Sequence, residues 1–156
     1  MLRMGKLTDY GIVLMSHLSS SVYQKYSAHT LSDAVNMPLP TVRKVLKSLS
    51  QYGLLVSERG VQGGYSLSRS PKKISVAEII AAIEGPIALT ECVSDDTHCE
   101  QEDHCDIQTN WEKINNAVFH ALDEVKLSDM LVKKVSDTHA IQFHPKKILT
   151  KSELHV

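Results

Sequence analysis

The sequence of 156 residues lacks any apolar run of the roughly 18 residues that a membrane-spanning helix needs, which predicts a chain without a membrane span. Its first residues lead into an amphipathic segment and lack the apolar core and small-residue cleavage site of a secretion signal. We therefore expect a cytoplasmic protein. Cysteine is scarce: the chain has only three, which is an odd number, and we expect the chain in a reducing compartment. This favours a metal site or reactive thiols over a disulfide framework.

The marks of an enzyme are missing as well. The sequence shows no nucleophile–base constellation and no phosphate-binding loop, and His17, His29 and His120 have no partner visible in the sequence. Internal repeats and low-complexity tracts are also absent. With 42% hydrophobic and 22% charged residues, the composition predicts a folded domain with a packed core. We expect a protein without catalytic activity.

Charge is distributed unevenly along the chain. Residues 1–73 carry ten Lys and Arg against three Asp and Glu, whereas residues 74–132 carry two against thirteen. Residues 133–156 are basic again, with five against two. Because nucleic-acid affinity depends largely on neutralising phosphates, the basic N-terminal part suits a polyanionic partner, and the acidic part suits another task.

The basic part has the pattern of a helix-turn-helix. We expect a first helix from Thr8, capped by Thr8 or Asp9, with an apolar stripe at Ile12, Met15, Leu18 and Val22. A short second helix is expected over residues 31–35, and a turn follows because Pro38 and Pro40 disfavour helix in the residues before them.

A third helix should begin at Pro40 and end at Gly53. Its apolar face is formed by Val42, Val45, Leu46 and Leu49, and its opposite face is basic and polar, as in a recognition helix.

A wing is predicted directly after this third helix. Residues 54–57 and 65–68 are strand candidates, and the glycine-containing segment 60–64 between them predicts a turn. Arg59 lies near the tip, where a guanidinium suits a minor groove or a phosphate. The residues that we assign to DNA contact are Pro40, Thr41, Arg43, Lys44, Lys47, Arg59 and Gln62.

Two further helices are expected in the acidic part. Ser75 and Glu78 form a capping box that opens a short helix, which Gly85-Pro86 ends. A longer helix should run from residue 110 or 111 to about 126, followed by a short turn over 128–131. Its apolar stripe is predicted to pair in a homodimer, to pack on the first helix of the same chain, or both: Trp111, Ile114, Val118, Leu122 and Val125.

The three cysteines lie between these two helices. Cys92, Cys99 and Cys105 are separated by six and five residues, which is too wide for a zinc ribbon. Thiolates are soft ligands that suit iron–sulfur clusters and zinc. Three of them can hold one face of a cluster and leave a fourth position open, so we predict a metal or cluster site.

The chain resembles the IscR/NsrR family of winged-helix transcription regulators, most closely the branch that regulates the SUF iron–sulfur assembly operon. The matching segments lie within residues 1–132 and include Lys6-Leu7-Thr8-Asp9-Tyr10-Gly11, Arg59-Gly60-x-x-Gly63-Gly64-Tyr65-Ser66-Leu67 and Glu84-Gly85-Pro86-Ile87-Ala88-Leu89-Thr90-Glu91-Cys92-Val93, with Pro38–Leu46, Ser75–Ile80 and Asn110-Trp111-x-x-Ile114-Asn115. The resemblance implies a homodimer that binds a promoter palindrome. It also implies one [2Fe-2S] or [4Fe-4S] cluster per subunit, with Cys92, Cys99 and Cys105 as ligands.

The sequence departs from the family pattern at two positions. IscR-like members carry histidine three residues after the last cysteine, where this chain has Gln108. NsrR-like members use an aspartate near the start of the first helix, donated by the partner subunit, and Asp9 matches that position. His98 and His104 are local alternatives for the fourth ligand. The IscR branch also has an acidic residue at the place of Arg43, which implies a different base preference, because arginine commonly pairs with guanine.

These observations together predict a mainly α fold with a small β-hairpin wing. We expect a winged helix-turn-helix domain over residues 1–73, a connecting helix over 74–89, a cysteine cluster-binding loop over 90–108, a dimerisation helix region over 109–136 and a mobile tail over 137–156. The predicted function is that of a promoter-binding repressor of iron–sulfur assembly genes that senses cluster or redox status. The alternative is a metal carrier, or a zinc- or thiol-based regulator with a winged-helix module.

Overall fold

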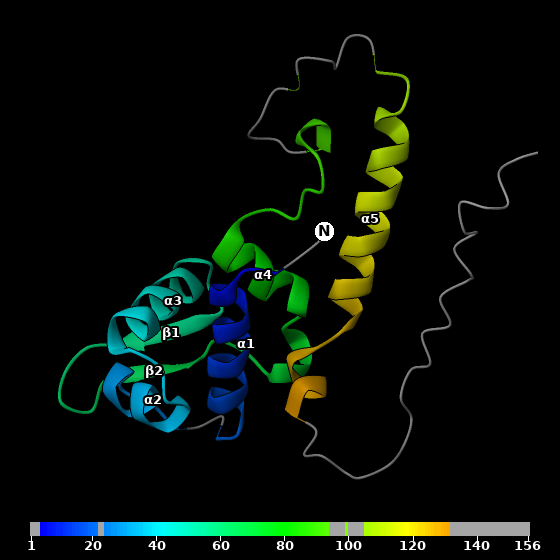
Figure 1. Cartoon of the computed structure of the whole chain (residues 1–156). Helices are drawn as coiled ribbons and strands as arrows, with labels where there is room; N and C mark the ends of the chain where they lie inside the picture. Colours follow the sequence, from blue (N-terminus) through cyan, green and yellow to red (C-terminus); the bar gives the residue numbers. More distant parts are fainter. Residues whose placement is uncertain (1–3, 22–23, 94–98, 100–104, 132–156) are drawn as a thin grey trace, which may run out of the picture.

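The computed structural model describes residues 4–21, 24–93, 99 and 105–131, and shows a helical body with a two-stranded hairpin and one projecting helix (Figure 1). The body contains α1 (Lys6–Ser19), α2 (Ala28–Val35), α3 (Leu39–Gln51) and α4 (Val76–Glu84). Short 3-10 turns lie at Pro71–Lys73 (η1), Glu91–Val93 (η2) and Leu127–Leu131 (η4). The expected winged-helix architecture is confirmed, and no helix in the described part of the chain has the length and apolarity needed to cross a membrane.

The first helix begins earlier than the sequence predicts. It starts at Lys6 after an extended Gly5, so the expected cap at Thr8 or Asp9 is wrong. Thr8 is fully buried and donates its hydroxyl hydrogen to Glu84 of α4, whereas Asp9 is exposed in the first turn. Met15 and Leu18 of the predicted stripe are buried and Ile12 is half-buried, while Val22 lies outside the described residues.

The second and third helices follow local signals closely. α2 begins three residues before its predicted start, because the Ser27 side chain caps it by accepting a hydrogen bond from the Thr30 N–H at 3.0 Å. Asn36 adopts the left-handed conformation and turns the chain toward α3. α3 begins at Leu39, and Gly53 ends this region with a φ of 84°. The four residues predicted for the apolar face of α3 are buried: Val42, Val45, Leu46 and Leu49.

The predicted hairpin is present with boundaries shifted by one residue. Strand β1 (Leu55–Glu58) pairs antiparallel with β2 (Gly64–Leu67), with Leu55 opposite Leu67 and Glu58 opposite Gly64. A backbone bridge between Tyr26 and Tyr65 attaches β2 to the segment that precedes α2. The wing is thereby fixed to the helix-turn-helix on one side.

Helix α4 opens with the predicted capping box. The Ser75 side chain accepts from the Glu78 N–H at 3.2 Å, and the Glu78 carboxylate accepts from the Ser75 N–H at 2.9 Å. Ile79 and Ile80 are buried and Ile83 is half-buried, and the helix ends at Glu84, before Gly85.

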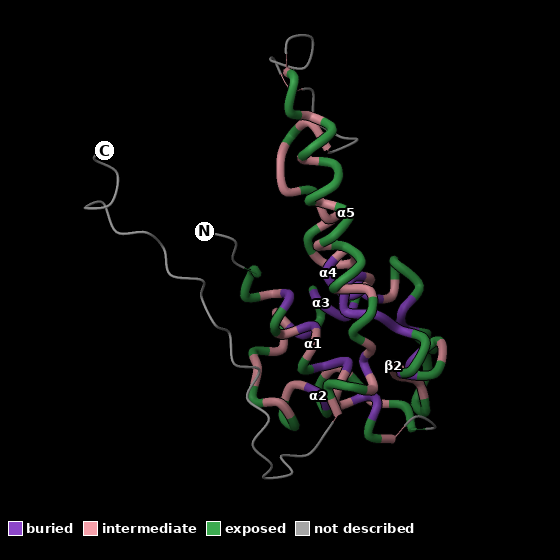
Figure 2. Tube along the Cα trace, turned by 90° about the vertical axis from the view of Figure 1, so that its right-hand side faces the viewer, coloured by how far each residue is buried: buried purple, intermediate pink, exposed green. Residues whose placement is uncertain are grey.

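Helix α5 (Gln108–Glu124) projects away from the body and contains no buried residue (Figure 2). Its main contacts are with α4 and η2, while α1 contacts η4. Two backbone hydrogen bonds attach its C-terminal end to the body, because the Val76 N–H donates to the Val125 carbonyl and the Leu127 N–H donates to the Ile74 carbonyl. Ser75 and Lys126 thus form an isolated antiparallel bridge.

Candidate nucleic-acid interface and cysteine segment

Helix α3 presents its basic face to solvent because its apolar face is buried in the body. Arg43, Lys44 and Lys47 are exposed, as is Pro40, and Thr41 is half-buried. The side of α3 near its C-terminus borders a groove of about 290 Å³ that is lined by Lys47, Ser50, Gln51, Ser57 and Tyr65. A helix with this arrangement can enter a major groove while its lysines contact phosphates.

The wing loop carries the other two predicted DNA contacts. Arg59 and Gln62 are both exposed on the five-residue connection between β1 and β2. The tight path of this loop requires glycine, since a Cβ on Gly63 would lie 2.2 Å from the Glu58 carbonyl oxygen. A Cβ on Gly64 would lie 2.7 Å from the Tyr26 carbonyl oxygen, so a side chain at either position would displace the wing.

The acidic residue at the end of β1 forms an ion pair with a lysine on the surface. The Lys25 ammonium lies 2.6 Å from the Glu58 carboxylate, and both side chains are substantially exposed. The lysine thereby neutralises the negative charge of Glu58, which is the only acidic residue of β1 and precedes Arg59 in sequence. The seven predicted contact residues therefore divide between two neighbouring elements, α3 and the wing loop, and leave the cations Arg43, Lys44, Lys47 and Arg59 exposed to a polyanion.

The cysteine segment begins beside the first turn of α5. Cys92 lies in η2, which contacts α5, and its thiol is 3.1 Å from the Thr90 hydroxyl. The Gln108 amide donates a long hydrogen bond of 3.5 Å to the Cys92 carbonyl. Cys92, Cys99 and Cys105 are all half-buried and free of disulfides. Gln108 therefore lies against the cysteine segment through its side-chain amide.

An asparagine on α5 fixes the approach to the cysteine segment. The Asn115 amide nitrogen donates to the Ile87 carbonyl at 3.0 Å, and its side-chain oxygen accepts from the Leu89 N–H at 3.1 Å. Sequence reasoning assigned no role to Asn115, although an amide next to the apolar stripe of a helix is a signal for such a backbone contact. Because both polar atoms are used, the chain just before Cys92 runs alongside α5 in a defined register.

The described residues of one chain do not assemble a complete metal site. They contain no cluster of three or more His, Cys, Asp or Glu side chains with metal-binding geometry, and Asp9 lies in α1, a helix of the body. His98 and His104 lie outside the described residues. The donor chemistry nevertheless fits an iron–sulfur cluster, since three reduced thiols are present within one segment.

The predicted dimer stripe on α5 is incompletely covered. Trp111, Val118 and Leu122 are half-buried, whereas Ile114 is 46% exposed and Val125 is also exposed. Phe119 adds a further apolar side chain, 41% exposed, that sequence reasoning did not include. Packing on the first helix of the same chain is not the main contact of α5, which meets α4 and η2.

Comparison with known proteins agrees with this architecture. The sequence model of the family described as Rrf2, iron-dependent transcriptional regulator, matches residues 4–133. The HTH-type transcriptional regulator IscR of Aliivibrio salmonicida is 27% identical over 115 residues, covering 71% of this chain and 68% of that protein. The solved structure of CymR, the global cysteine regulator of B. subtilis, has a TM-score of 0.65 and 29% identity, covering 84% and 97% of the two chains. The structure of T. potens IscR has a TM-score of 0.63 at 23% identity, covering 92% and 97%, and shows a shared fold.

Proposed function

Because this chain belongs to the Rrf2 family of iron-dependent transcriptional regulators, we propose that it represses iron–sulfur assembly genes in response to a cluster held by its own cysteines. DNA-binding transcription regulation follows from the family, whose members are regulators and not enzymes. The target genes, the cluster and the repressor role are the proposal.

The observation that carries the proposal is the placement of the three thiols. Cys92 lies in η2, and Cys105 lies shortly before the first residue of α5. Both are therefore at the end of α5 that is farthest from the bridge to the body, and Cys99 lies between them in sequence. A bound cluster would cross-link its cysteine ligands, and its gain, loss or oxidation would change the local charge. CymR, which has a similar fold, is described as a global cysteine regulator. Because the fold alone therefore does not indicate a cluster, the three thiols of this chain are the observation that favours one here.

The fourth ligand is proposed to come from a second copy of the chain. Asp9 is exposed in the first turn of α1, and the described residues of one chain contain no group of three or more side chains that could hold a metal. The uncovered stripe on α5 supports a homodimer, in which Asp9 of one subunit is proposed to reach the cysteine segment of the other. An oxygen ligand binds iron less tightly than a thiolate, so this position is the one open to small molecules.

DNA recognition is proposed to use α3 and the wing together. Pro40, Thr41 and Arg43 lie at the start of α3, where a recognition helix reads base edges, and Lys44 and Lys47 follow on its exposed face. On the wing loop, Arg59 and Gln62 suit a phosphate or the minor groove. A two-fold dimer then presents two such surfaces to a palindrome.

Purification without oxygen tests the cluster proposal directly. The wild-type protein should show visible absorption with iron and acid-labile sulfide, and Cys92→Ala, Cys99→Ala or Cys105→Ala should each abolish it. A colourless protein that contains stoichiometric zinc would establish the zinc-based alternative instead. Binding to promoter DNA, which a metal carrier would lack, separates a regulator from a carrier.

A second series identifies the fourth ligand. Asp9→Ala should retain a cluster with an altered spectrum or a shorter lifetime. If Asp9→Ala keeps the wild-type spectrum and lifetime while His98→Ala or His104→Ala loses the absorption, the ligand is local and the arrangement between subunits is wrong. Asp33→Ala removes an exposed carboxylate from α2 and serves as the control.

A further inference from the structure

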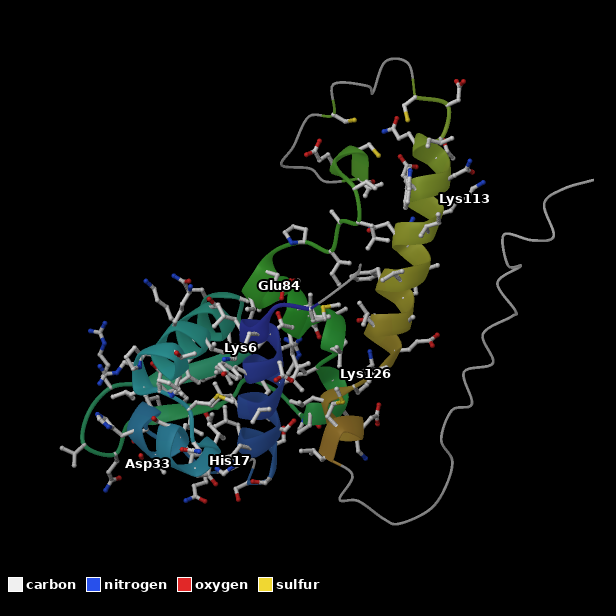
Figure 3. All side chains as sticks on the ribbon, viewed as in Figure 1. Lys6, His17, Asp33, Glu84, Lys113 and Lys126 are labelled. Atoms are coloured by element: carbon white, nitrogen blue, oxygen red, sulfur yellow. The ribbon has the colours of Figure 1, made fainter. Side chains whose placement is uncertain are left out.

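The start of helix α1 is held by a residue of a distant helix. Gly5 precedes α1 and has no side chain with which to cap it, so the N–H groups of the first turn lack a local side-chain acceptor. The Glu84 carboxylate contacts this end of α1 instead, since one of its oxygens accepts from the Gly5 N–H at 2.7 Å and also from the Thr8 hydroxyl. Figure 3 shows Glu84 at the end of α4, beside the start of α1 that Lys6 marks.

The packing around this carboxylate is close. Thr8 is fully buried, and a Cβ on Gly5 would lie 2.6 Å from the Glu84 oxygen, so glycine is what allows the approach. A carboxylate at a helix N-terminus is also stabilised by the helix dipole. The contact therefore holds the first turn of α1 in one position against the end of α4.

The location of Glu84 gives this contact a further consequence. Glu84 is the last residue of α4, and the chain leaves it through Gly85, with a φ of 93°, toward the segment that Asn115 fixes and then toward Cys92. On the other side of the contact, Asp9 directly follows Thr8 in the same helical turn. One carboxylate thus joins the start of the cysteine segment to the turn that carries Asp9.

We propose that Glu84 is a positioning residue that couples the cysteine segment of each chain to the first turn of its α1. Displacement of the segment that follows α4 moves this turn, and with it the helix that packs on α3. The part of this inference that concerns Asp9 rests on the proposed function. The contact between α4 and α1 does not depend on any cluster.

The test compares three variants of the full-length protein. Glu84→Gln keeps a side-chain oxygen that accepts from Gly5 and Thr8, whereas Glu84→Ala removes it and Glu84→Asp shortens the reach. In the cluster-free protein, amide hydrogen exchange at Gly5 should be faster in Glu84→Ala and Glu84→Asp and near wild type in Glu84→Gln. Asp33→Ala controls for the loss of one exposed carboxylate.

The second measurement is the ratio of promoter affinities with and without the cluster. We expect Glu84→Ala to reduce this ratio by about fivefold or more, while the affinity of the cluster-free protein stays at its wild-type value. A merely structural role would lower both affinities together. Unchanged Gly5 exchange in Glu84→Ala and Glu84→Asp would overturn the contact, and an unchanged affinity ratio would overturn the coupling.

These outcomes are distinct from failure of the proposed function. If the cysteine variants lose the visible absorption while Glu84→Ala keeps the wild-type ratio, the cluster stands and the coupling through Glu84 is wrong. If the wild-type protein holds no cluster, the proposed function is wrong, and the affinity ratio that the coupling requires does not exist, which overturns the coupling as well. In that case the amide hydrogen exchange at Gly5 still tests the contact between Glu84 and the start of α1.

Discussion

Arg69 donates a hydrogen bond from its guanidinium to the carboxylate of Glu78, and that carboxylate also accepts from the Ser75 N–H. Arg69 lies two residues beyond β2, and its Nε donates to the Lys73 carbonyl at 3.0 Å. The start of α4 is therefore tied both to its own cap and to the base of the wing.

Removing the Glu78 carboxylate should destabilise the fold. Glu78→Ala loses one half of the capping box and the partner of Arg69, so the free energy of unfolding should fall by about 1–2 kcal/mol. Urea denaturation measures this difference. Glu78→Gln keeps the reach to Ser75 and should lose less, and equal losses in both variants would show that the capping contact contributes little.

Removing lysines from α3 should weaken DNA binding on every sequence. Lys44→Ala and Lys47→Ala should each lower the slope of log affinity against log salt by about one unit, because each removes one phosphate contact. Arg59→Ala should weaken promoter binding as well. Lys113→Ala on α5 is the matched control, since this lysine is exposed far from α3 (Figure 3). Wild-type binding by all three DNA-face variants would show that the assigned face is wrong.

A charge in the uncovered stripe of α5 should prevent dimerisation. Ile114→Asp places a carboxylate where we propose an apolar contact between subunits, and burying it without a partner is costly. Analytical ultracentrifugation should show a shift toward monomer. Asn116→Asp, an exposed position on the same helix, should remain dimeric, and an unchanged dimer in Ile114→Asp would remove this residue from the interface.

Loss of the Asn115 side chain should loosen the approach to Cys92. Asn115→Ala removes both hydrogen bonds to the backbone of Ile87 and Leu89, so we expect faster amide exchange at Leu89 and a shorter lifetime of any bound cluster. Asn116→Ala removes a neighbouring exposed amide and should leave both unchanged. Wild-type exchange at Leu89 in Asn115→Ala would contradict the assignment.

The acid stability of the chain should depend on Asp123. A hydrogen bond from the Ser75 side chain, aided by the charge of Lys126, holds the pKa of Asp123 below its ordinary value. Its stabilising effect is therefore complete above the ordinary aspartate pKa of about 4 and is lost as the pH falls through the lower pKa of the folded state. Asp123→Asn should therefore make the free energy of unfolding depend less on pH in this range. Acid denaturation followed by circular dichroism measures this dependence, and an identical acid limb in Asp123→Asn would refute the linkage.

The sequence predicted the features that depend on residues close together in the chain, and it did not predict those that depend on residues far apart in the chain. The buried face of α3, the hairpin and the Ser75 capping box depend on residues a few positions apart, and periodicity and turn chemistry predicted them. The start of α1 was predicted wrongly because the residue that holds it, Glu84, lies 79 residues from Gly5. Likewise, the stripe of α5 was visible in the sequence, but its contacts with α4 and η2 were not. Cysteine spacing indicates a ligand chemistry and does not reveal which chain supplies the fourth donor.

The bridge between Ser75 and Lys126 attaches the C-terminal end of α5 to the body. The 17 residues of α5 extend about 25 Å at the usual helical rise, and the cysteine segment is attached at the far end. A tilt of α5 by about 10° around this attached end would move its other end, where the cysteine segment begins, by about 4 Å relative to the body.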